Sequence, residues 1–106
     1  MKLCIILNTN HPETSWNAVR LGSAAMANGH EANLCLLGPG VELENIKNAS
    51  FDVTEVFKGF VSSGGSSFAC GTCLEQRHQE AGACSISTMS QLVEIIADAD
   101  KVVTFG

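Results

Sequence analysis

Two cysteines at close spacing are the residues of this sequence best suited to chemistry. The segment Cys70-Gly71-Thr72-Cys73 places two thiols three positions apart. Thiols at this spacing can exchange, because one attacks a sulfur atom and the other resolves the mixed disulfide or persulfide that forms. Hydrolysis is disfavoured, since the sequence offers no Ser-His-Asp arrangement and no paired carboxylates in the predicted loops. The pattern therefore indicates thiol or sulfur chemistry.

The surroundings of this pair favour a reactive sulfur. Residues 66–69 predict a strand and residues 74–79 predict a helix, so Cys70–Cys73 is expected to form the turn between them. Backbone N–H groups and the dipole at a helix start favour an anion such as a thiolate. Gly71 permits a tight turn. Arg77 lies one helical turn beyond Cys73, so its cation is expected to face the same site.

The thiols also suit a metal ion, which is the alternative interpretation. Four soft or borderline ligands suffice for tetrahedral zinc, and the candidates are Cys70, Cys73, His78 and Cys84. Such a site would make the chain a non-catalytic module that binds metal or stabilises an assembly. A thiol-disulfide oxidoreductase is a further alternative. Taken alone, Cys84 is expected to be an exposed loop thiol. Cys4 and Cys35 lie in apolar runs and are expected to be buried.

The elements that position these residues alternate along the chain. Short apolar runs predict strands at 2–7, 31–37, 66–69 and 101–105. Caps and apolar periodicity predict helices that begin near Pro12, Val41, Asp52, Leu74 and Thr88. Strands separated by helices imply a parallel sheet with helices on both faces. We expect one α/β domain over residues 1–106, a small doubly wound sheet of four to five strands with flavodoxin-like topology.

The expected strand order then locates a site. We predict that strand 2–7 lies between strands 31–37 and 66–69, with strand 101–105 beyond the latter. Ligands of such folds bind past the carboxyl ends of the strands, where the order reverses. The loops at residues 8–13 and 70–73 would meet there. The predicted chemistry is carried by Cys70, Cys73 and Arg77, with substrate contacts from Asn8, His11, Gly71 and Thr72.

Composition limits the class of partner. The chain has 106 residues, 45% of them hydrophobic, and 11 acidic against 6 basic residues give a net charge of −5. No cationic face is available for nucleic acid. No apolar run reaches the ~18 residues of a membrane span. The first residues do not resemble a secretory signal, and free thiols suit a reducing compartment, so a cytoplasmic location is expected. Apolar edge strands at 31–37 and 101–105 predict a homo-oligomer.

Several longer segments resemble one family. FACGTCLEQR, followed by STMSQLVEIIADADKVVTF, is similar to the C-terminal half of the DsrE/DsrF-like family. The stretch HPETSWNAVRLGSAAMANGHEANLCLLGPGV is similar to the first helix and second strand of that family. The resemblance spans nearly the whole chain. Its most specific part is the Cys-Gly-Thr-Cys-Leu turn together with Ser-Thr-Met.

This resemblance implies a sulfur-relay function. Members have a compact α/β fold, often assemble as trimers or hexamers, and include proteins that carry sulfur on a cysteine as a persulfide. The sulfur-carrying cysteine follows the third strand, seven residues before an arginine, which matches Cys70 and Arg77. Cys73 matches a second cysteine found in some relatives, and His78 stands where the family usually has glycine. The resemblance implies sulfur-donor and sulfur-acceptor proteins as partners and no cofactor.

Overall fold

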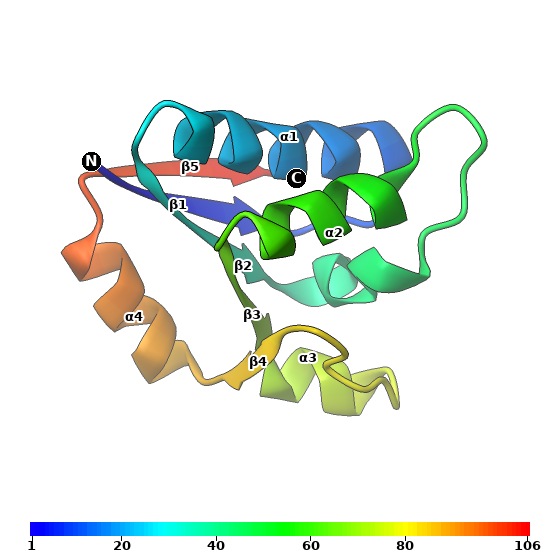
Figure 1. Cartoon of the computed structure of the whole chain (residues 1–106). Coiled ribbons are helices and arrows are strands. Elements are labelled where there is room, and N and C mark those ends of the chain that lie inside the picture. Colours follow the sequence, from blue (N-terminus) through cyan, green and yellow to red (C-terminus); the bar gives the residue numbers. More distant parts are fainter.

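One parallel sheet of five strands organises the chain, which alternates between strands and helices (Figure 1). The computed structural model describes residues 1–106. Its elements are β1 (Lys2–Leu7), α1 (Pro12–Ala27), β2 (Glu31–Leu36), the 3-10 helix η1 (Gly38–Asn45), α2 (Val53–Ser62), β3 (Ser66–Cys70), α3 (Gly71–Gln76), β4 (Ser85–Ser87), α4 (Met89–Asp98) and β5 (Lys101–Phe105). The predicted α/β class with a parallel sheet is confirmed.

The strand order differs from the prediction. The sheet runs β4-β3-β2-β1-β5, so β3 lies beside β2, and β5 lies beside β1. The predicted neighbourhood of strands 2–7 and 66–69 is therefore wrong. The inner strands β1, β2 and β3 all contribute apolar side chains to the sheet, but this pattern does not say which of them pair. The consequence for the site is that the loop after β2 lies between the loops after β1 and β3.

The fifth strand is one that the hydropathy pattern did not reveal. β4 has only three residues, Ser-Ile-Ser, which pair in parallel with the end of β3. The sheet edges are consequently β4 and β5. The expectation that strand 31–37 is an edge is wrong, because β2 is paired on both sides.

The two faces of the sheet carry cores of different size. Helices α1 and α2 cover one face and α4 lies on the other (Figure 1). Alternate strand residues such as Ile5 and Leu34 join the larger core, which also includes Leu74 of α3. On the α4 face, Cys4 and Cys35 pack with Leu92. Both thiols are buried as predicted, at 0% and 2% exposure.

Helix α1 packs through small residues. Its buried positions are Ser15, Ala18, Val19 and Gly22. A β-carbon on Gly22 would lie 2.7 Å from Cε1 of Phe60, so the bare backbone of α1 makes room for the buried ring from α2. Gly22 thus allows α1 and α2 to pack closely.

Three helices, α1, α2 and α4, begin where the sequence predicts, whereas the helices expected from Val41 and Leu74 begin three residues earlier, at Gly38 (as the 3-10 helix η1) and at Gly71. Pro12 begins α1, and Asp52 caps α2 by accepting the Glu55 N–H at 3.1 Å. Thr88 and Gln91 form a reciprocal capping box at the start of α4. None of the helices has the length and apolar character needed to cross a bilayer.

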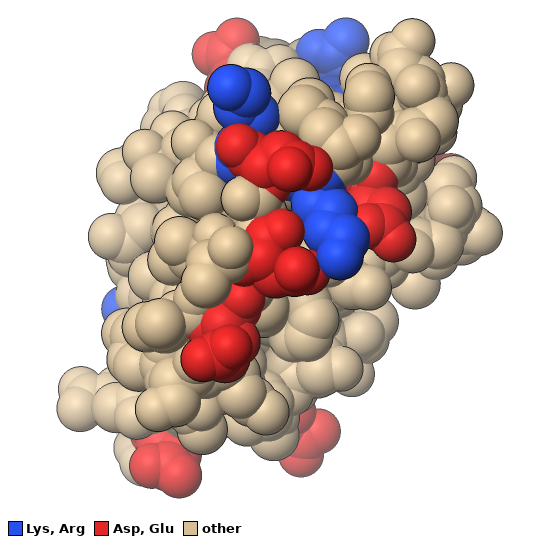
Figure 2. Space-filling view, turned by 90° about the vertical axis from the view of Figure 1, so that its left-hand side faces the viewer, with Lys and Arg blue, Asp and Glu red and all other residues tan.

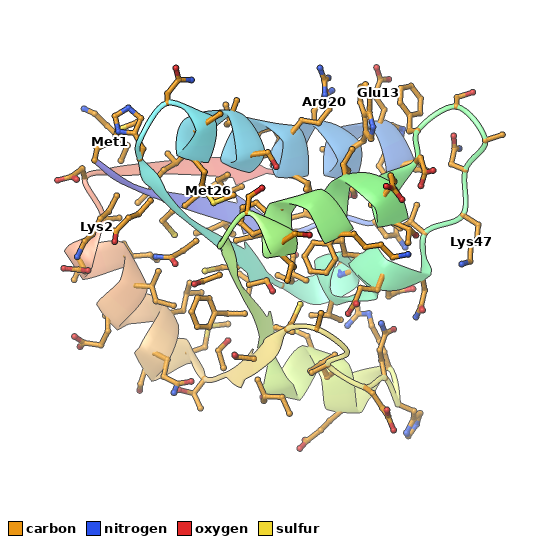
Figure 3. The ribbon with its side chains drawn as sticks, viewed as in Figure 1. Met1, Lys2, Glu13, Arg20, Met26 and Lys47 are labelled. Carbon is orange, nitrogen blue, oxygen red and sulfur yellow. The ribbon has the colours of Figure 1, made fainter.

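Charged side chains gather at the amino ends of the strands, away from the cysteine pair. Met1 and Lys2 lie at this end, opposite Lys47 (Figure 3). Lys2 Nζ lies 2.8 Å from a carboxylate oxygen of Asp98, and its backbone N–H donates to Asp100 at 2.6 Å. Figure 2 views this end of the molecule and shows acidic groups with basic groups among them. Lys2 and Asp98 thus form an exposed ion pair at this end.

Candidate functional site

Three loops meet in a row at the carboxyl ends of β1, β2 and β3. The Leu37 N–H donates to the Leu7 carbonyl oxygen at 3.0 Å, which folds the loop after β2 over the end of β1. Gly38 has a φ of +51°, and a β-carbon there would overlap the side-chain oxygen of Asn8. Because β2 is central, the expected meeting of the loops at 8–13 and 70–73 takes place across Gly38 rather than directly.

Cys70 ends β3 and serves as the N-cap residue of α3. The predicted turn over residues 70–73 is therefore a strand end followed at once by the first helical turn. Cys70 is only 5% exposed, and its side chain accepts no hydrogen bond from the helix start. Alternation along β3 places Cys70 on the same side as Phe68, which packs under α4.

Cys73 lies in the first turn of α3 and faces a different neighbour. It is partly exposed and packs against the larger core. Its Sγ accepts the backbone N–H of Gly38 at 3.3 Å. Sequence reasoning did not include Gly38 in the site. The available signal was the Gly38-Pro39-Gly40 turn directly after an apolar strand.

Arg77 lies one turn beyond Cys73, as its spacing predicts. Its Nη1 donates to the Cys73 carbonyl oxygen at 3.2 Å, and its Nε lies 3.2 Å from Oε2 of Glu42. Both side chains of this ion pair are about one-third exposed, at 31% and 36%. Such pairs contribute about 0–1 kcal/mol to stability. The geometric effect is clearer, because the pair ties the end of α3 to η1.

The segment from residue 79 to residue 84 is held against η1 by two further contacts. Gln79 Nε2 donates to the Val41 carbonyl oxygen at 2.9 Å. The Ala83 N–H donates to a carboxylate oxygen of Glu44 at 3.1 Å. Together with the Arg77 pair, these contacts hold η1 beside Cys73. The donor at Gly38, the first residue of η1, is thereby kept in place.

The remaining predicted site residues have other surroundings. His11 caps α1, since its Nδ1 accepts the Thr14 N–H at 3.3 Å. Asn8 packs against Gly38. Thr72 is exposed in the first turn of α3, and Gly71 lies against Ile86 of β4. These contacts leave the predicted substrate-binding roles of the four residues as predictions.

The four candidate metal ligands are not brought together. No group of three or more His, Cys, Asp or Glu side chains has a geometry that could hold a metal ion. The expectation that Cys84 is an exposed loop thiol is wrong: it is 9% exposed and belongs to the larger core. Burial raises the pKa of its thiol, as does Glu44, while a hydrogen bond with Ser67 lowers it.

The largest cavity lies beside α3 and contains neither thiol of the pair. Its volume is about 710 Å³, and the exposed His78, with a φ of +50°, stands on its wall. The lining residues are Gly71, Leu74, Glu75, His78, Gln79, Glu80, Ala81 and Ile86. The cavity thus opens on the β4 side of the cysteine pair, whereas the Gly38 contact lies on the η1 side.

Comparison with known proteins gives consistent matches over the full chain. The uncharacterised protein MJ0989 of Methanocaldococcus jannaschii is 28% identical over 115 residues, which cover 99% of this chain and 100% of that protein. The structure of MTH1491, a protein of unknown function from Methanobacterium thermoautotrophicum, matches with a TM-score of 0.75 at 9% identity. That match covers 97% of both chains and shows a shared fold.

The family follows from a sequence model rather than from the fold alone. The DsrE/DsrF-like family model matches residues 1–105, a span that includes every strand and the cysteine pair. This agrees with the resemblance carried by the Cys-Gly-Thr-Cys segment and by the capped helix that follows it. The chain belongs to the DsrE/DsrF-like family.

Proposed function

We propose that this protein is a sulfur carrier that accepts sulfane sulfur on the Cys70–Cys73 pair as a cysteine persulfide and passes it on. The observation that supports this most is Cys73, a partly exposed residue whose sulfur accepts the Gly38 N–H. Membership of the DsrE/DsrF-like family suggests a sulfur-relay function. The donor and the acceptor of the sulfur are proposed to be partner proteins.

The transfer step conserves atoms and electrons. A cysteine thiolate attacks the terminal sulfur of a donor persulfide, R–S–SH. The donor S–S bond breaks, a new bond forms between the cysteine Sγ and the transferred sulfur, and the donor leaves as the thiolate R–S⁻. No external oxidant or reductant is consumed, so the proposed chemistry requires no cofactor. The product is a persulfide on this chain.

The test is sulfur loading measured by mass. Wild-type protein is incubated with glutathione persulfide, and its intact mass is recorded before and after reduction. We expect one added sulfur atom that a reductant removes. The double variant Cys70→Ser/Cys73→Ser should gain none. Cys84→Ser should load like wild type, because that thiol is buried in the core.

Two results would count against the proposal. Sulfur retained on the double variant would place the chemistry on another cysteine. A wild-type chain that never gains sulfur, and instead holds one zinc ion per subunit, would favour the metal-binding module. Elemental analysis of the freshly purified protein distinguishes that case.

We further propose that the protein assembles as a homo-oligomer, a trimer or hexamer, through the exposed side of α4. Met89, Val93 and Ile96 follow one another at helical spacing and are 59%, 60% and 38% exposed. On the same side of the sheet, Val102 of the edge strand β5 is 42% exposed. A helix that covers the sheet with one apolar stripe and exposes a second is suited to a second protein surface.

Val93→Lys is expected to reduce the assembly to monomers. A lysine there places a charge in the apolar stripe, while the exposed position leaves the monomer fold intact. Glu94→Lys, on the neighbouring exposed position, is the matched control and should leave the assembly unchanged. Light scattering coupled to size-exclusion chromatography gives the mass. A wild-type monomer, or a Val93→Lys variant with wild-type mass, contradicts this interface.

A further inference from the structure

The two cysteines of the pair have different environments, and this difference assigns an order to their roles. The family resemblance points to Cys70 as the sulfur carrier. Resting on the proposed function, we propose that Cys73 is instead the thiol that first accepts sulfur from the donor. Three features of the structure carry this inference. They are the access to each sulfur, the hydrogen bond that each sulfur accepts, and the fixed position of the Gly38 N–H group.

Access favours Cys73. A sulfur donor must bring its terminal sulfur in line with the attacking thiolate, which requires an open approach. Cys70 is 5% exposed at the end of β3, on the side of the sheet that α4 covers. Cys73 is partly exposed in the first turn of α3. Of the two residues, Cys73 is thus the more open to a sulfur donor.

Hydrogen bonding also distinguishes the two sulfurs. The Gly38 N–H lies 3.3 Å from the Sγ of Cys73 and donates to it, whereas the Cys70 side chain accepts no bond from the start of α3. An N–H donor stabilises a sulfur that carries negative charge more than a neutral thiol. The same donor can stabilise the thiolate before attack and the persulfide anion after it. Gly38 is thus a positioning residue for the acceptor sulfur.

The Gly38 N–H group is held in place by contacts with the neighbouring loops. The Gly40 N–H donates to the Leu37 carbonyl oxygen at 2.9 Å, which closes a turn around Gly38. The Asn8 side chain packs on the open side of Gly38, and Arg77 ties η1 to α3 through Glu42. A hydrogen-bond donor that is in position before the reaction needs no rearrangement when negative charge develops on the sulfur.

The balanced step follows from this placement. The Cys73 thiolate attacks the terminal sulfur of R–S–SH, the donor S–S bond breaks, and R–S⁻ leaves. The new persulfide sits on Cys73, with Cys70 as the thiol that takes part afterwards. Attack of the Cys70 thiolate on the Sγ of Cys73 would then form a Cys70–Cys73 disulfide and release HS⁻. Over the two steps together, the two thiols are oxidised to a disulfide, and the donor persulfide is reduced to R–S⁻ and HS⁻.

Single variants separate this inference from the proposed function itself. Cys70→Ser and Cys73→Ser are each incubated with glutathione persulfide, and the modified peptide is identified by mass spectrometry. We expect Cys70→Ser to retain the added sulfur on the Cys73 peptide and to hold it longer than wild type, because sulfide release needs both thiols. Cys73→Ser should show at least about a tenfold loss of loading rate.

A second measurement does not depend on the sulfur donor. Alkylation of folded wild-type protein by iodoacetamide, followed by peptide mapping, should label Cys73 at least about tenfold faster than Cys70. Thermal unfolding of both serine variants checks that each is folded. If Cys73→Ser took up sulfur and Cys70→Ser did not, the assignment would be overturned and the proposed function would stay intact. Wild-type protein that neither gains sulfur nor forms a Cys70–Cys73 disulfide removes the proposed function, and faster labelling of Cys70 still overturns the assignment.

Discussion

Gly40→Ala is expected to lower the free energy of unfolding by about 3 kcal/mol. Gly40 is buried, and a β-carbon there would overlap the Leu7 carbonyl oxygen. That oxygen also accepts the Leu37 N–H, so the clash is with backbone that is already held in place. Backbone, unlike a flexible side chain, cannot rotate away. Urea unfolding followed by circular dichroism measures the effect.

Gly59→Ala is the matched control for this substitution. Gly59 lies within α2, and a β-carbon there would meet nothing within 4 Å. Alanine at such a helical position should stabilise the protein by about 0.5–1 kcal/mol. The two variants thus make the same chemical change with opposite expected signs. If Gly40→Ala were as stable as wild type, the close approach of η1 to β1 described above would be wrong.

The second large effect is a loss of stability at alkaline pH. Burial, together with the charge and hydrogen bond of Cys4, raises the pKa of the Cys35 thiol to about 12 from the ordinary 9.0. The unfolded thiol therefore ionises before the folded one does. Stability is fully present below the unfolded pKa and is lost as pH rises from about 9 towards about 12, by about 1.4 kcal/mol per pH unit.

Urea unfolding at about pH 8 and about pH 10.5 should show about 2 kcal/mol of loss from Cys35 alone. Burial also raises the pKa of Cys4 and of Cys84, which adds to the loss in the same direction. Cys35→Ala should make the pH dependence shallower, although it removes packing at all pH values. Equal slopes for wild type and Cys35→Ala would contradict the buried environment assigned to this thiol.

The elements of the fold could be predicted because each has a local cause. The apolar runs at Lys2–Leu7 and Lys101–Phe105 form strands at the expected residues, and Pro12 and Thr88 mark the helix starts. The strand order could not be obtained in this way. The inner strands β1 and β2 present apolar side chains to both faces of the sheet, so their apolar pattern does not specify which strands become neighbours. β4 has only three residues, too few to show the alternation of apolar and polar residues that identifies a strand.

The site was predictable in its chemistry but not in its geometry. The spacing of Cys70, Cys73 and Arg77 is a local property, and α3 places the latter two one turn apart as expected. The contact between Gly38 and Cys73 joins residues 35 positions apart, and it depends on β2 lying beside β3. The burial of Cys84 also depends on a contact between residues distant in sequence. Its immediate neighbours, Ala83 and Ser85, are small and do not indicate a core position, but the bond from the Ala83 N–H to Glu44 holds this loop against η1.

The position of β5 has a consequence for how the protein is made. Strands β1 to β4 add to the sheet in the order of synthesis, but Lys101 pairs opposite Leu3 on the other side of β1. While the ribosome translates the intervening residues, one side of the β1 backbone has no partner, and an unpaired edge invites aggregation. The nascent chain must therefore keep this edge protected until residues 101–105 emerge. Closing so long a loop also makes late docking of β5 a natural slow step in folding.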